Sequence, residues 1–541
     1  MKIKCFLFGA VALVLAACSS EENEAPIANG EAYLQLTVKL PSTDGTRSTT
    51  DEDGKTAEGT ENGQVYENNI SSLQVILDDG THSYAKTVDF STPGNVPAAG
   101  VSVYNTPPIK VEGLVGGATY TAYVIVNGSY AGSDIKNAAI EGLTTIPGLA
   151  VTGSIAESKK FLMTGFKTMT SAIEANTAVY TKDNPLKLGE IEVERAVARI
   201  DYRQEKANNT YDVNASNPGE LLVKLTDVAL TNVSPSFYLF KRVSADGTNN
   251  TPGWTLGGKE VGGTTPNYVV DHNFANKTFA KWHTGTKASF LNTFAGTTSA
   301  TYTSLSSLTT EDNPWSTTEP TYSYGGYKIW TYCTENTIQA DPVAPLDPNQ
   351  INGLSTGVIF KGEILTTSTI TKYGSTTDKA FNGTDNVYVL NGILYGDWAA
   401  VLTAKTTDAV PDVVSAFTAG GLNDTENSNT VAKLQTAGFT RYTPQDGHYY
   451  VYYTYWNRHN DNGKDTEMGP MEFAVVRNNV YKLAVISISG LGHPNDPTNP
   501  GGDPDPDGPD PEDPDEDGVG MFLKVSVKVM PWIEGGYGIK L

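Results

Sequence analysis

Few residues in this chain are spaced for catalysis. The segment Gly353–Gly357 (GLSTG) fits the G-x-S-x-G pattern, which places a nucleophilic serine between a strand and a helix. Here a polar segment precedes the serine, a strand-like segment (VIFKGEIL) follows it, and no histidine can be assigned to it as a base. The pattern therefore indicates a glycine-rich turn that leads into a strand. We predict no catalytic residue and no enzyme activity.

Metal-binding patterns are also weak. The string Asp503–Gly508 (DPDPDG) matches half of a calcium-binding loop, but Pro514 stands at the twelfth position, where such a loop needs a bidentate glutamate. We therefore expect weak calcium binding at most, no dedicated metal site and no cofactor. None of the histidines has metal-ligand spacing; they are His82, His272, His283, His448, His459 and His493.

Two further groups have alternative explanations. The segment Tyr449–Trp456 (YYVYYTYW) is aromatic on both faces, so it is either a sugar-binding platform or a strand that packs on both sides. The second arrangement is the more common one, and we predict a core strand. Glu192 and Glu194 fall on one face of a predicted strand and are expected to be surface charges rather than an acid–base pair.

The N-terminus has the features of an export signal. A basic start (MKIK) precedes an apolar run that is too short to span a bilayer as a permanent helix. The run ends in Leu15–Cys18 (LAAC), which resembles a bacterial lipobox. The resemblance implies cleavage before Cys18, diacylation of its thiol and acylation of its new amine, and several acyl chains anchor far better than one. The alternative is ordinary secretory cleavage nearby, with Cys18 incidental.

Composition limits the remaining functions. The chain has 541 residues, which is too long for one typical domain, and a net charge of −23, which argues against nucleic-acid binding. Only three cysteines occur. Cys5 leaves with the signal and Cys18 takes lipid, so Cys333 is alone, no intrachain disulfide can form, and we expect Cys333 to be a small core residue.

Alternating apolar residues predict β-structure in two series. The first begins at Ala32–Pro41, where one face holds Leu34, Leu36, Val38 and Leu40, and a long polar, glycine-rich loop follows it. Strand-like runs separated by turn signals continue to KKFLMTGF, and a second, longer series starts near LGEIEVERAVARIDYR. Short helices are expected at PDVVSAFTAGG and NTVAKLQTAGF. The pattern indicates an all-β protein with an antiparallel β-sandwich followed by a larger β-domain.

The C-terminal end has an unusual arrangement. An acidic, proline-rich stretch without a basic residue, Asp496–Asp517, is followed by one alternating segment, LKVSVKVMP. A lone strand cannot satisfy its own backbone or bury its apolar face, so we expect this one to enter a groove elsewhere. It resembles the first strand, LQLTVKLP, in its alternating aliphatics, in one outward lysine and in a closing proline that is expected to end the ladder. The two strands could therefore occupy the same groove at different times.

Several segments together resemble one family. They are VERAVARIDY, TYCTENT, STGVIFKGEI, YYTYWNRHNDNG and MGPMEFAVVRNNVYKLAVISISGLGHP. These segments resemble the fimbrillins, specifically the Mfa-type major fimbrial subunits of the type V pili of Bacteroidia. The resemblance implies two transthyretin-like antiparallel β-sandwich domains and export as a lipoprotein precursor. It also implies that a trypsin-like protease removes the N-terminal strand, after which the C-terminal donor strand of one subunit fills the groove opened in the next.

The resemblance also implies particular site residues. The family's cleavage arginine falls in the loop after the first strand, and Arg47 is the only arginine between Cys18 and Arg195, so the expected cut lies between Arg47 and Ser48. The donor residues expected to fill the groove are Leu523, Val525, Val527 and Val529. The predicted division of the chain is 1–17 signal peptide, 18–47 N-terminal strand and propeptide, 48–185 N-terminal sandwich, 186–494 C-terminal sandwich, 495–519 linker and 520–541 donor strand.

The expected partners are identical or related fimbrial subunits, a trypsin-like processing protease, and the outer membrane through the lipid. The lipidated precursor is expected at the cell outer membrane and the mature subunit in the extracellular fimbrium. Two alternatives are an accessory or tip adhesin of the same pilus and a surface glycan-binding lipoprotein that would use Trp398 and Trp456. The terminal strand and its tether favour a polymerising subunit, because a monomeric glycan binder needs neither.

The LAAC motif predicts lipid attachment at Cys18. Newly exported protein should carry acyl mass on an N-terminal Cys18, and Cys18→Ala should leave the precursor unlipidated and lower its surface display. Intact-mass and N-terminal peptide spectrometry measure this directly. A mature N-terminus at another residue, without acyl mass, would contradict the lipobox interpretation.

Overall fold

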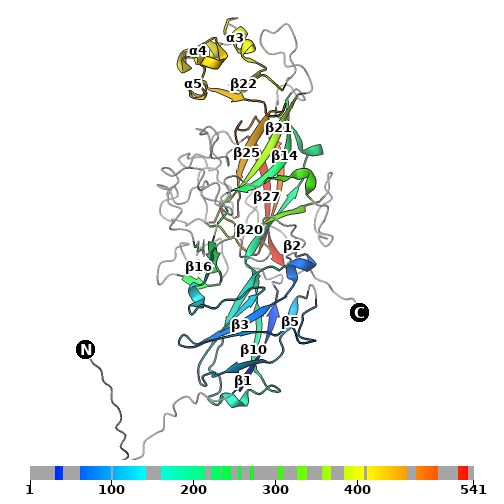
Figure 1. Cartoon of the computed structure of the whole chain (residues 1–541), viewed down its shortest axis with the longest axis vertical. Coiled ribbons are helices and arrows are strands. Elements are labelled where there is room, and N and C mark those ends of the chain that lie inside the picture. The colour runs from blue at the N-terminus through cyan, green and yellow to red at the C-terminus, as the bar shows by residue number, and fades with distance from the viewer. Residues whose placement is uncertain are drawn as a thin grey trace, which may run out of the picture.

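The structure is a computed structural model, and β-strands are the main secondary structure of its described residues. The predicted all-β fold is confirmed. The molecule is elongated, with the first strand at one end and a small helical module at the other (Figure 1). Within the described part of the chain no helix has the length and apolar character needed to cross a membrane. The described residues are 31–40, 61–98, 101–141, 160–213, 221–231, 233–234, 236–244, 254–257, 268–270, 272, 302–308, 326–337, 356–366, 383–406, 411–459, 471–496 and 522–533.

Two sheets form the N-terminal part, and their inward side chains belong to one apolar cluster. The first sheet has the order β10-β1-β5, with β6 also paired to β1, and contains β1 (Glu31–Lys39), β5 (Val103–Asn105), β6 (Ile109–Glu112) and β10 (Leu186–Glu192). The second has the order β11-β9-β7-β3-β4 and contains β3 (Leu73–Asp78), β4 (Ser83–Thr87), β7 (Thr121–Val126), β9 (Met163–Thr168) and β11 (Glu194–Arg195).

Two larger sheets form the C-terminal part. One has the order β2-β27-β26-β12-β20 and contains β2 (Glu61–Asn62), β12 (Val197–Arg203), β20 (Lys328–Thr334), β26 (Asn479–Ile488) and β27 (Leu523–Ile533). The other has the order β13-β14-β21-β25, with β19 on β14, and contains β13 (Thr210–Asp212), β14 (Leu221–Thr231), β19 (Thr303–Ser304), β21 (Gly357–Thr366) and β25 (Tyr450–Trp456). Most pairings are antiparallel, but β1–β10, β12–β26 and β2–β27 are parallel.

Smaller sheets complete the fold. β8 (Ala139–Glu141) pairs with β15 (Ser236–Tyr238) and thereby joins an N-terminal segment to a C-terminal one. β16 (Arg242–Ser244) pairs with both β17 (Trp254–Leu256) and β18 (Tyr268–Val269).

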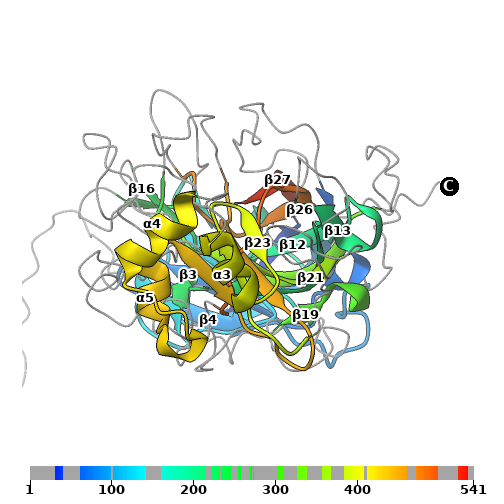
Figure 2. The same ribbon diagram turned by 90° about the horizontal axis from the view of Figure 1, so that it is seen from above.

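The helical module forms the far end of the molecule, and its helices lie over the ends of the sheets (Figure 2). Trp398 anchors its separate apolar cluster: its ring stacks on Phe417 at 5.5 Å and its Nε1 donates to the Asp424 carbonyl at 2.9 Å. The module contains β22 (Val387–Leu390), β23 (Ile393–Tyr395), α3 (Trp398–Thr406), α4 (Pro411–Gly420), α5 (Val431–Thr436) and β24 (Phe439–Tyr442). The two expected short helices are present as α4 and α5, whereas α3 was not predicted.

Sheet membership changes between β11 and β12. β10 pairs with β1 and β11 pairs with β9, whereas β12 pairs with β20 and β26. The segment Leu186–Glu192 therefore belongs with the N-terminal sheets, although the sequence-based division placed it after the boundary at 185. The reason is that its partner, β1, is more than a hundred residues earlier in the chain, and alternation alone carries no information about partners. The division into domains itself stays a prediction.

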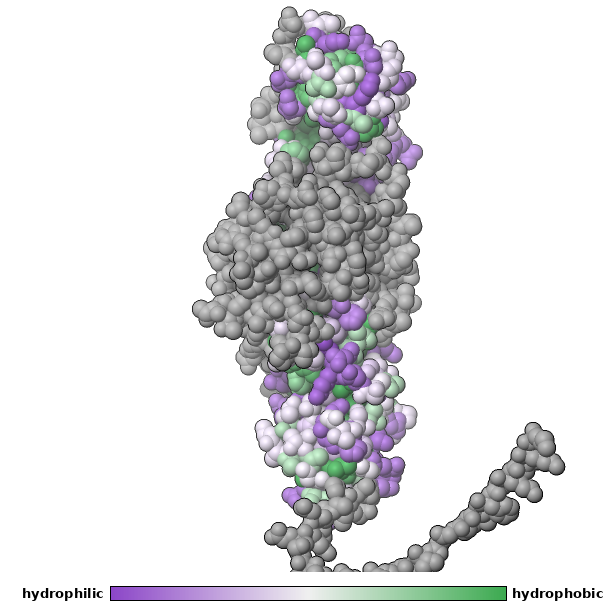
Figure 3. All heavy atoms as spheres, turned by 90° about the vertical axis from the view of Figure 1, so that its left-hand side faces the viewer, coloured by the Kyte–Doolittle hydropathy of each residue, from purple (hydrophilic) through white to green (hydrophobic). Residues whose placement is uncertain are grey.

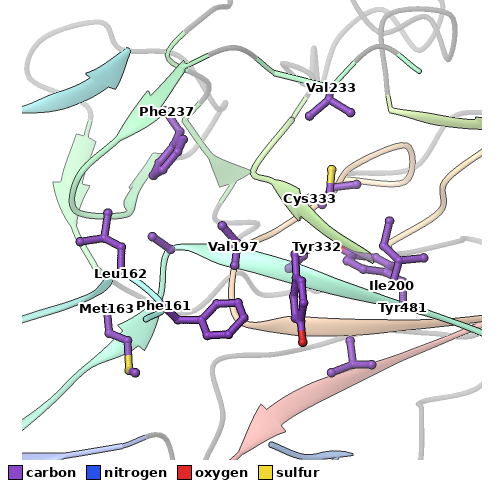
Figure 4. Packing of buried hydrophobic residues seen from close by; sticks show 14 of the residues in the cluster. Phe161, Leu162, Met163, Val197, Ile200, Val233, Phe237, Tyr332, Cys333 and Tyr481 are labelled. Carbon is purple, nitrogen blue, oxygen red and sulfur yellow. The ribbon is translucent and has the colours of Figure 1, made fainter. Parts of the chain in front are cut away.

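The interior next to this change of sheets is tightly packed. Figure 4 shows Cys333 among apolar side chains of β12, β20 and β26, and the Phe161 ring meets Tyr332 edge-on at 4.7 Å. Cys333 is fully buried as a free thiol, which confirms its predicted role as a core residue.

A buried charge cluster closes the junction between the two parts. Arg199 contacts Asp201 through two bonds of 2.9 Å and reaches Glu61 and Glu67 at 3.1 Å each. Glu61 also pairs with Lys482 at 2.6 Å, and all five side chains are almost completely buried. The carboxylates come from the segment after the first loop (β2 and a 3₁₀ turn, Val65–Asn68) and from β12. Removing one partner of such a cluster leaves an uncompensated buried charge, so the cluster fixes this segment against the C-terminal sheet.

The three carboxylates of this cluster outnumber its two paired cations. Burial raises the pKa of Asp201 from 3.8 to about 6, although the Arg199 guanidinium acts in the opposite direction. The folded state therefore binds more protons at Asp201 than the unfolded state between these two pH values. The contribution of Asp201 to the free energy of unfolding is largest below this window, falls as the pH rises through it, and is constant above it.

Asp201→Asn should remove this dependence. We expect the wild-type free energy of unfolding to fall more steeply than that of the variant between about pH 4 and about pH 6. Urea unfolding at several pH values measures the difference, with Asp183→Asn at an exposed position as the control. Equal slopes for the wild type and Asp201→Asn would contradict the raised pKa of Asp201.

Candidate functional site

β1 occupies the centre of its sheet. It pairs with β10 on one side, in parallel, and with β5 and β6 on the other side. Its alternating residues Leu34, Leu36, Val38 and Leu40 are at most 2% exposed, as the sequence pattern predicts. Removal of β1 would therefore leave an apolar groove whose two walls both present unpaired backbone groups.

The outward face of β1 makes specific polar contacts. Gln35 Nε2 donates to the Thr106 carbonyl at 2.7 Å, and Thr37 Oγ1 donates to Asn105 Oδ1 at 2.6 Å. Lys187 on β10 donates to Gln35 Oε1, and Lys39 is in register with Glu192. These contacts depend on the side chain at each outward position, so the groove distinguishes strands by more than apolar area.

β27 lies in a sheet of its own chain. It pairs antiparallel with β26 from Leu523 to Pro531, and its last residues, Trp532 and Ile533, pair with β2. The inference that this strand must satisfy its backbone elsewhere is therefore wrong for the isolated chain, because β26 offers it an edge. Pro531 ends the β26 ladder, as predicted, but the strand itself continues along β2.

The two edges of β27 are used unequally. Its inward side chains are well buried: Leu523 is 5% exposed, and Val525, Val527 and Val529 are 1–2% exposed. Among the described strands, however, only β26 follows it along most of its length, and β2 touches it only at Trp532 and Ile533. The β26 ladder is also interrupted by an irregularity between Val485 and Ser487. Within the described part of the chain, β27 is thus paired mainly along one edge.

Several predicted site residues lie outside the described part of the chain. They are Cys18, Arg47, Ser48, the DPDPDG string and the tether between 497 and 521. Ser355 of the GLSTG segment is also outside it, although β21 does begin at Gly357, as the predicted turn into a strand requires. The lipidation and cleavage sites therefore stay predictions.

The candidate sugar-binding aromatics are buried. Trp398 is 5% exposed inside the helical module, and Trp456 is 2% exposed at the end of β25. Tyr453 on the same strand donates its hydroxyl to the Gly490 carbonyl at 3.0 Å. Neither tryptophan presents a ring face to solvent, so these residues do not form a sugar platform, and the core interpretation of Tyr449–Trp456 is confirmed.

The acidic pair and the metal candidates also have structural explanations. Glu192 lies exposed on β10, whereas Glu194 on β11 pairs with the buried Lys241 at 3.0 Å. His459 is buried, with its Nδ1 2.8 Å from the Tyr481 hydroxyl. Across the described ranges no group of three or more His, Cys, Asp or Glu side chains could hold a metal ion. Figure 3 shows hydrophilic and hydrophobic residues intermingled over both ends of the molecule.

Sequence comparison supports one family. Residues 448–537 match the sequence model described as "Major fimbrial subunit protein type IV, Fimbrillin, C-terminal". The matched range includes β25, β26 and β27. It therefore contains both the C-terminal strand, β27, and its ladder partner, β26. This match identifies a fimbrillin C-terminal region. No curated protein sequence matches the chain.

Solved structures of fimbrial and adhesion proteins align over most of the chain with low similarity. A putative cell adhesion protein from Parabacteroides distasonis has 14% identity and a TM-score of 0.39, covering 93% of this chain and 97% of its own. A fimbrilin from Porphyromonas gingivalis has 13% identity and a TM-score of 0.36, covering 94% and 99%. The tip fimbrial protein Mfa3 from the same organism has 10% identity and a TM-score of 0.34, covering 93% and 100%. These values are too low to carry an argument about function.

The segment Glu61–Asn68 is the main feature of the structure that sequence reasoning missed. Its first four letters, ENGQ, fall at the end of the polar loop that the sequence predicts, and the next four, VYEN, carry no strand or helix pattern. In the structure Glu61, Glu67 and Asn68 are buried, and Tyr332 donates its hydroxyl to Glu67 at 2.6 Å. Both acids pair with Arg199 of VERAVARIDY, and Arg195 of the same segment donates to the Glu67 carbonyl and to Asn68. No spacing rule within one strand reveals such pairing.

Proposed function

We propose that this protein is a structural subunit of the shaft of a cell-surface fimbria. It is exported as a lipoprotein to the outer membrane, and a trypsin-like protease then cuts after Arg47 and releases β1. β27 of another subunit fills the emptied groove. The observation that carries the proposal is that β1 is paired on both sides and has the same buried-face spacing as β27.

The backbone ladder gives this exchange its direction. Among the strands that the structure describes, β27 is bonded mainly to β26, whereas in the place of β1 it would be bonded on both sides. Each exchange therefore leaves fewer strand edges unpaired than a cleaved monomer has. Filling the groove with four aliphatic side chains is worth roughly 6–12 kcal/mol before ordering costs, at about 1.5–3 kcal/mol each. The donor strand loses comparable apolar contacts in its own sheet, and this loss offsets much of the gain from filling the groove. The second backbone ladder that β27 gains in the groove therefore decides the sign of the free energy of exchange.

The shaft role is inferred from two features of the chain, a removable first strand and a tethered last strand. A subunit with a removable first strand can accept a neighbour, and a subunit with an alternating last strand on a long tether can donate to another. The tether of about 24 residues could extend to roughly 75 Å at about 3.1 Å per residue. A chain with both capacities can be joined on both sides, which a shaft subunit needs.

Cleavage after Arg47 should trigger assembly. Mild trypsin treatment of the purified precursor should release the β1 segment and produce high-mass ladders on unboiled gels. The double variant Arg47→Ala/Lys55→Ala removes both basic sites that are near the cut, and it should remain monomeric because β1 keeps the groove closed. N-terminal sequencing identifies the cut. Normal ladders from the uncleaved double variant would show that strand removal is not the trigger.

Val527→Asp should abolish donation. A carboxylate at this inward position would enter an apolar groove without a partner, so cleaved Val527→Asp protein should form no ladder. Lys524→Gln, at an exposed outward position of the same strand, is the matched control and should polymerise.

A mixing experiment separates loss of donation from misfolding. The Val527→Asp subunit keeps its own groove, so after cleavage it should accept wild-type donors, cap the chains and shorten wild-type ladders. Wild-type polymer yield from Val527→Asp alone would exclude β27 as the donor.

A further inference from the structure

Three of the four outward residues of β27 match those of β1 in chemical type, as all four inward residues do. We propose that a second copy's β27 enters the β1 slot in a single register, with Leu523 at the place of Leu34, and that Asn105 and Glu192 set that register. This inference rests on the proposed strand exchange and specifies the residues that recognise the incoming strand.

The match extends over eight positions. Aligned without a gap, Tyr33–Leu40 (YLQLTVKL) and Phe522–Val529 (FLKVSVKV) have an aromatic residue first, a hydroxyl residue fifth and a lysine seventh. Aliphatic residues occupy every second position of both. The match requires the incoming strand to run in the direction of β1, parallel to β10. A shift of one residue would turn the lysines into the core. A shift of two residues would keep the aliphatic side chains in the core. Only the contacts of the outward side chains oppose such a shift.

Asn105 contacts the side chain at the fifth position of the strand. In the structure its Oδ1 accepts a hydrogen bond of 2.6 Å from the Thr37 hydroxyl. In the proposed register Ser526 brings a hydroxyl to the same place, so the bond can re-form. A shift of two residues in either direction would put the Lys524 or Lys528 side chain there instead.

Glu192 lies opposite the seventh position of the strand. Lys39 of β1 is in register with Glu192 on β10, and Lys528 would take its place. In its own chain Lys528 stands directly opposite Lys482 on β26, and the Lys482 ammonium group is already paired with Glu61 at 2.6 Å. Opposite charges in register across a ladder are favourable. The exchange therefore gives Lys528 a carboxylate neighbour in place of a lysine that is paired elsewhere.

One position opposes the exchange. Gln35 accepts a bond from Lys187 and donates to the Thr106 carbonyl. Lys524 would keep a donor for Thr106 but would bring its ammonium group close to Lys187. In this register Lys524→Gln should restore the contacts that Gln35 makes, so its ladders should form at least as fast as those of the wild type.

The backbone bonding around Asn105 makes a direct test practicable. Leu36 and Thr106 are bonded through the Thr106 N–H, and Leu40 and Ser102 through the Leu40 N–H. The pair of Thr37 and Asn105 lies between these two hydrogen-bonded pairs and is therefore a non-hydrogen-bonded pair. In an antiparallel ladder the side chains of such a pair are closer together than those of a hydrogen-bonded pair. Two cysteines at such a pair fall within the separation that a disulfide requires.

The test is disulfide trapping in assembled polymer. Asn105→Cys is combined in turn with Ser526→Cys, Lys524→Cys and Lys528→Cys; each protein is cleaved, assembled, mildly oxidised and boiled without reductant. We expect a ladder that survives boiling only with Ser526→Cys and that collapses to monomer on reduction. Cys333 is buried, so it provides a silent background.

The outcomes distinguish this inference from the proposed function. Trapping with Lys524→Cys or Lys528→Cys instead would overturn the register while leaving β27 as the donor. Polymers that form with every pair but trap with none would overturn the placement of β27 in the slot, and with it the proposed mechanism.

If the cysteine variants do not assemble, exchanging the charges at Glu192 and Lys528 tests the register instead. Glu192→Lys should reduce ladder formation severalfold, and adding Lys528→Glu in the same chain should restore it. If Lys528→Glu brings no recovery, the assignment of Glu192 to the seventh position is wrong.

Discussion

The need to pair the backbone on both sides of a central strand governs this structure. β1 satisfies it with β10 on one side and β5 and β6 on the other, and its buried aliphatics then complete the core between the sheets. A central strand of this kind cannot leave unless another replaces it, because both walls and the core would be exposed together. β27 has the length and alternation of a replacement, and among the described strands one neighbour, β26, pairs with most of it.

The charge cluster at Arg199 serves the same arrangement. It fixes Glu61 of β2 and Glu67 of the 3₁₀ turn to the C-terminal sheet, so the chain is anchored at the first described strand after the expected cut. Buried ion clusters add little net stability compared with apolar packing, but they penalise any arrangement that separates their members. In the exchange proposed above, the cluster would keep the geometry of this junction while a strand on one side of it is replaced.

The sequence predicted what depends on local pattern. Alternation identified β1 and β27 with their inward residues, and composition identified α4 and α5. Partners are set by tertiary pairing, so the sequence did not reveal that β10 belongs beside β1, or that β27 rests against β26 in the isolated chain. The Glu61–Asn68 segment was missed because its polar residues are buried by charge pairing, which hydrophobic periodicity cannot detect.

Cys333 has a consequence for the conditions under which the protein can work. Its thiol is completely buried between strands, and burial raises its pKa to about 12. Only the thiolate reacts readily with oxidants and disulfides, and it is almost absent at neutral pH at such a site. Cys5 and Cys18 are the only other cysteines. If they are removed or acylated as expected, the folded mature chain has no reactive thiol and no disulfide, so its folded state does not depend on the thiol–disulfide balance of the medium.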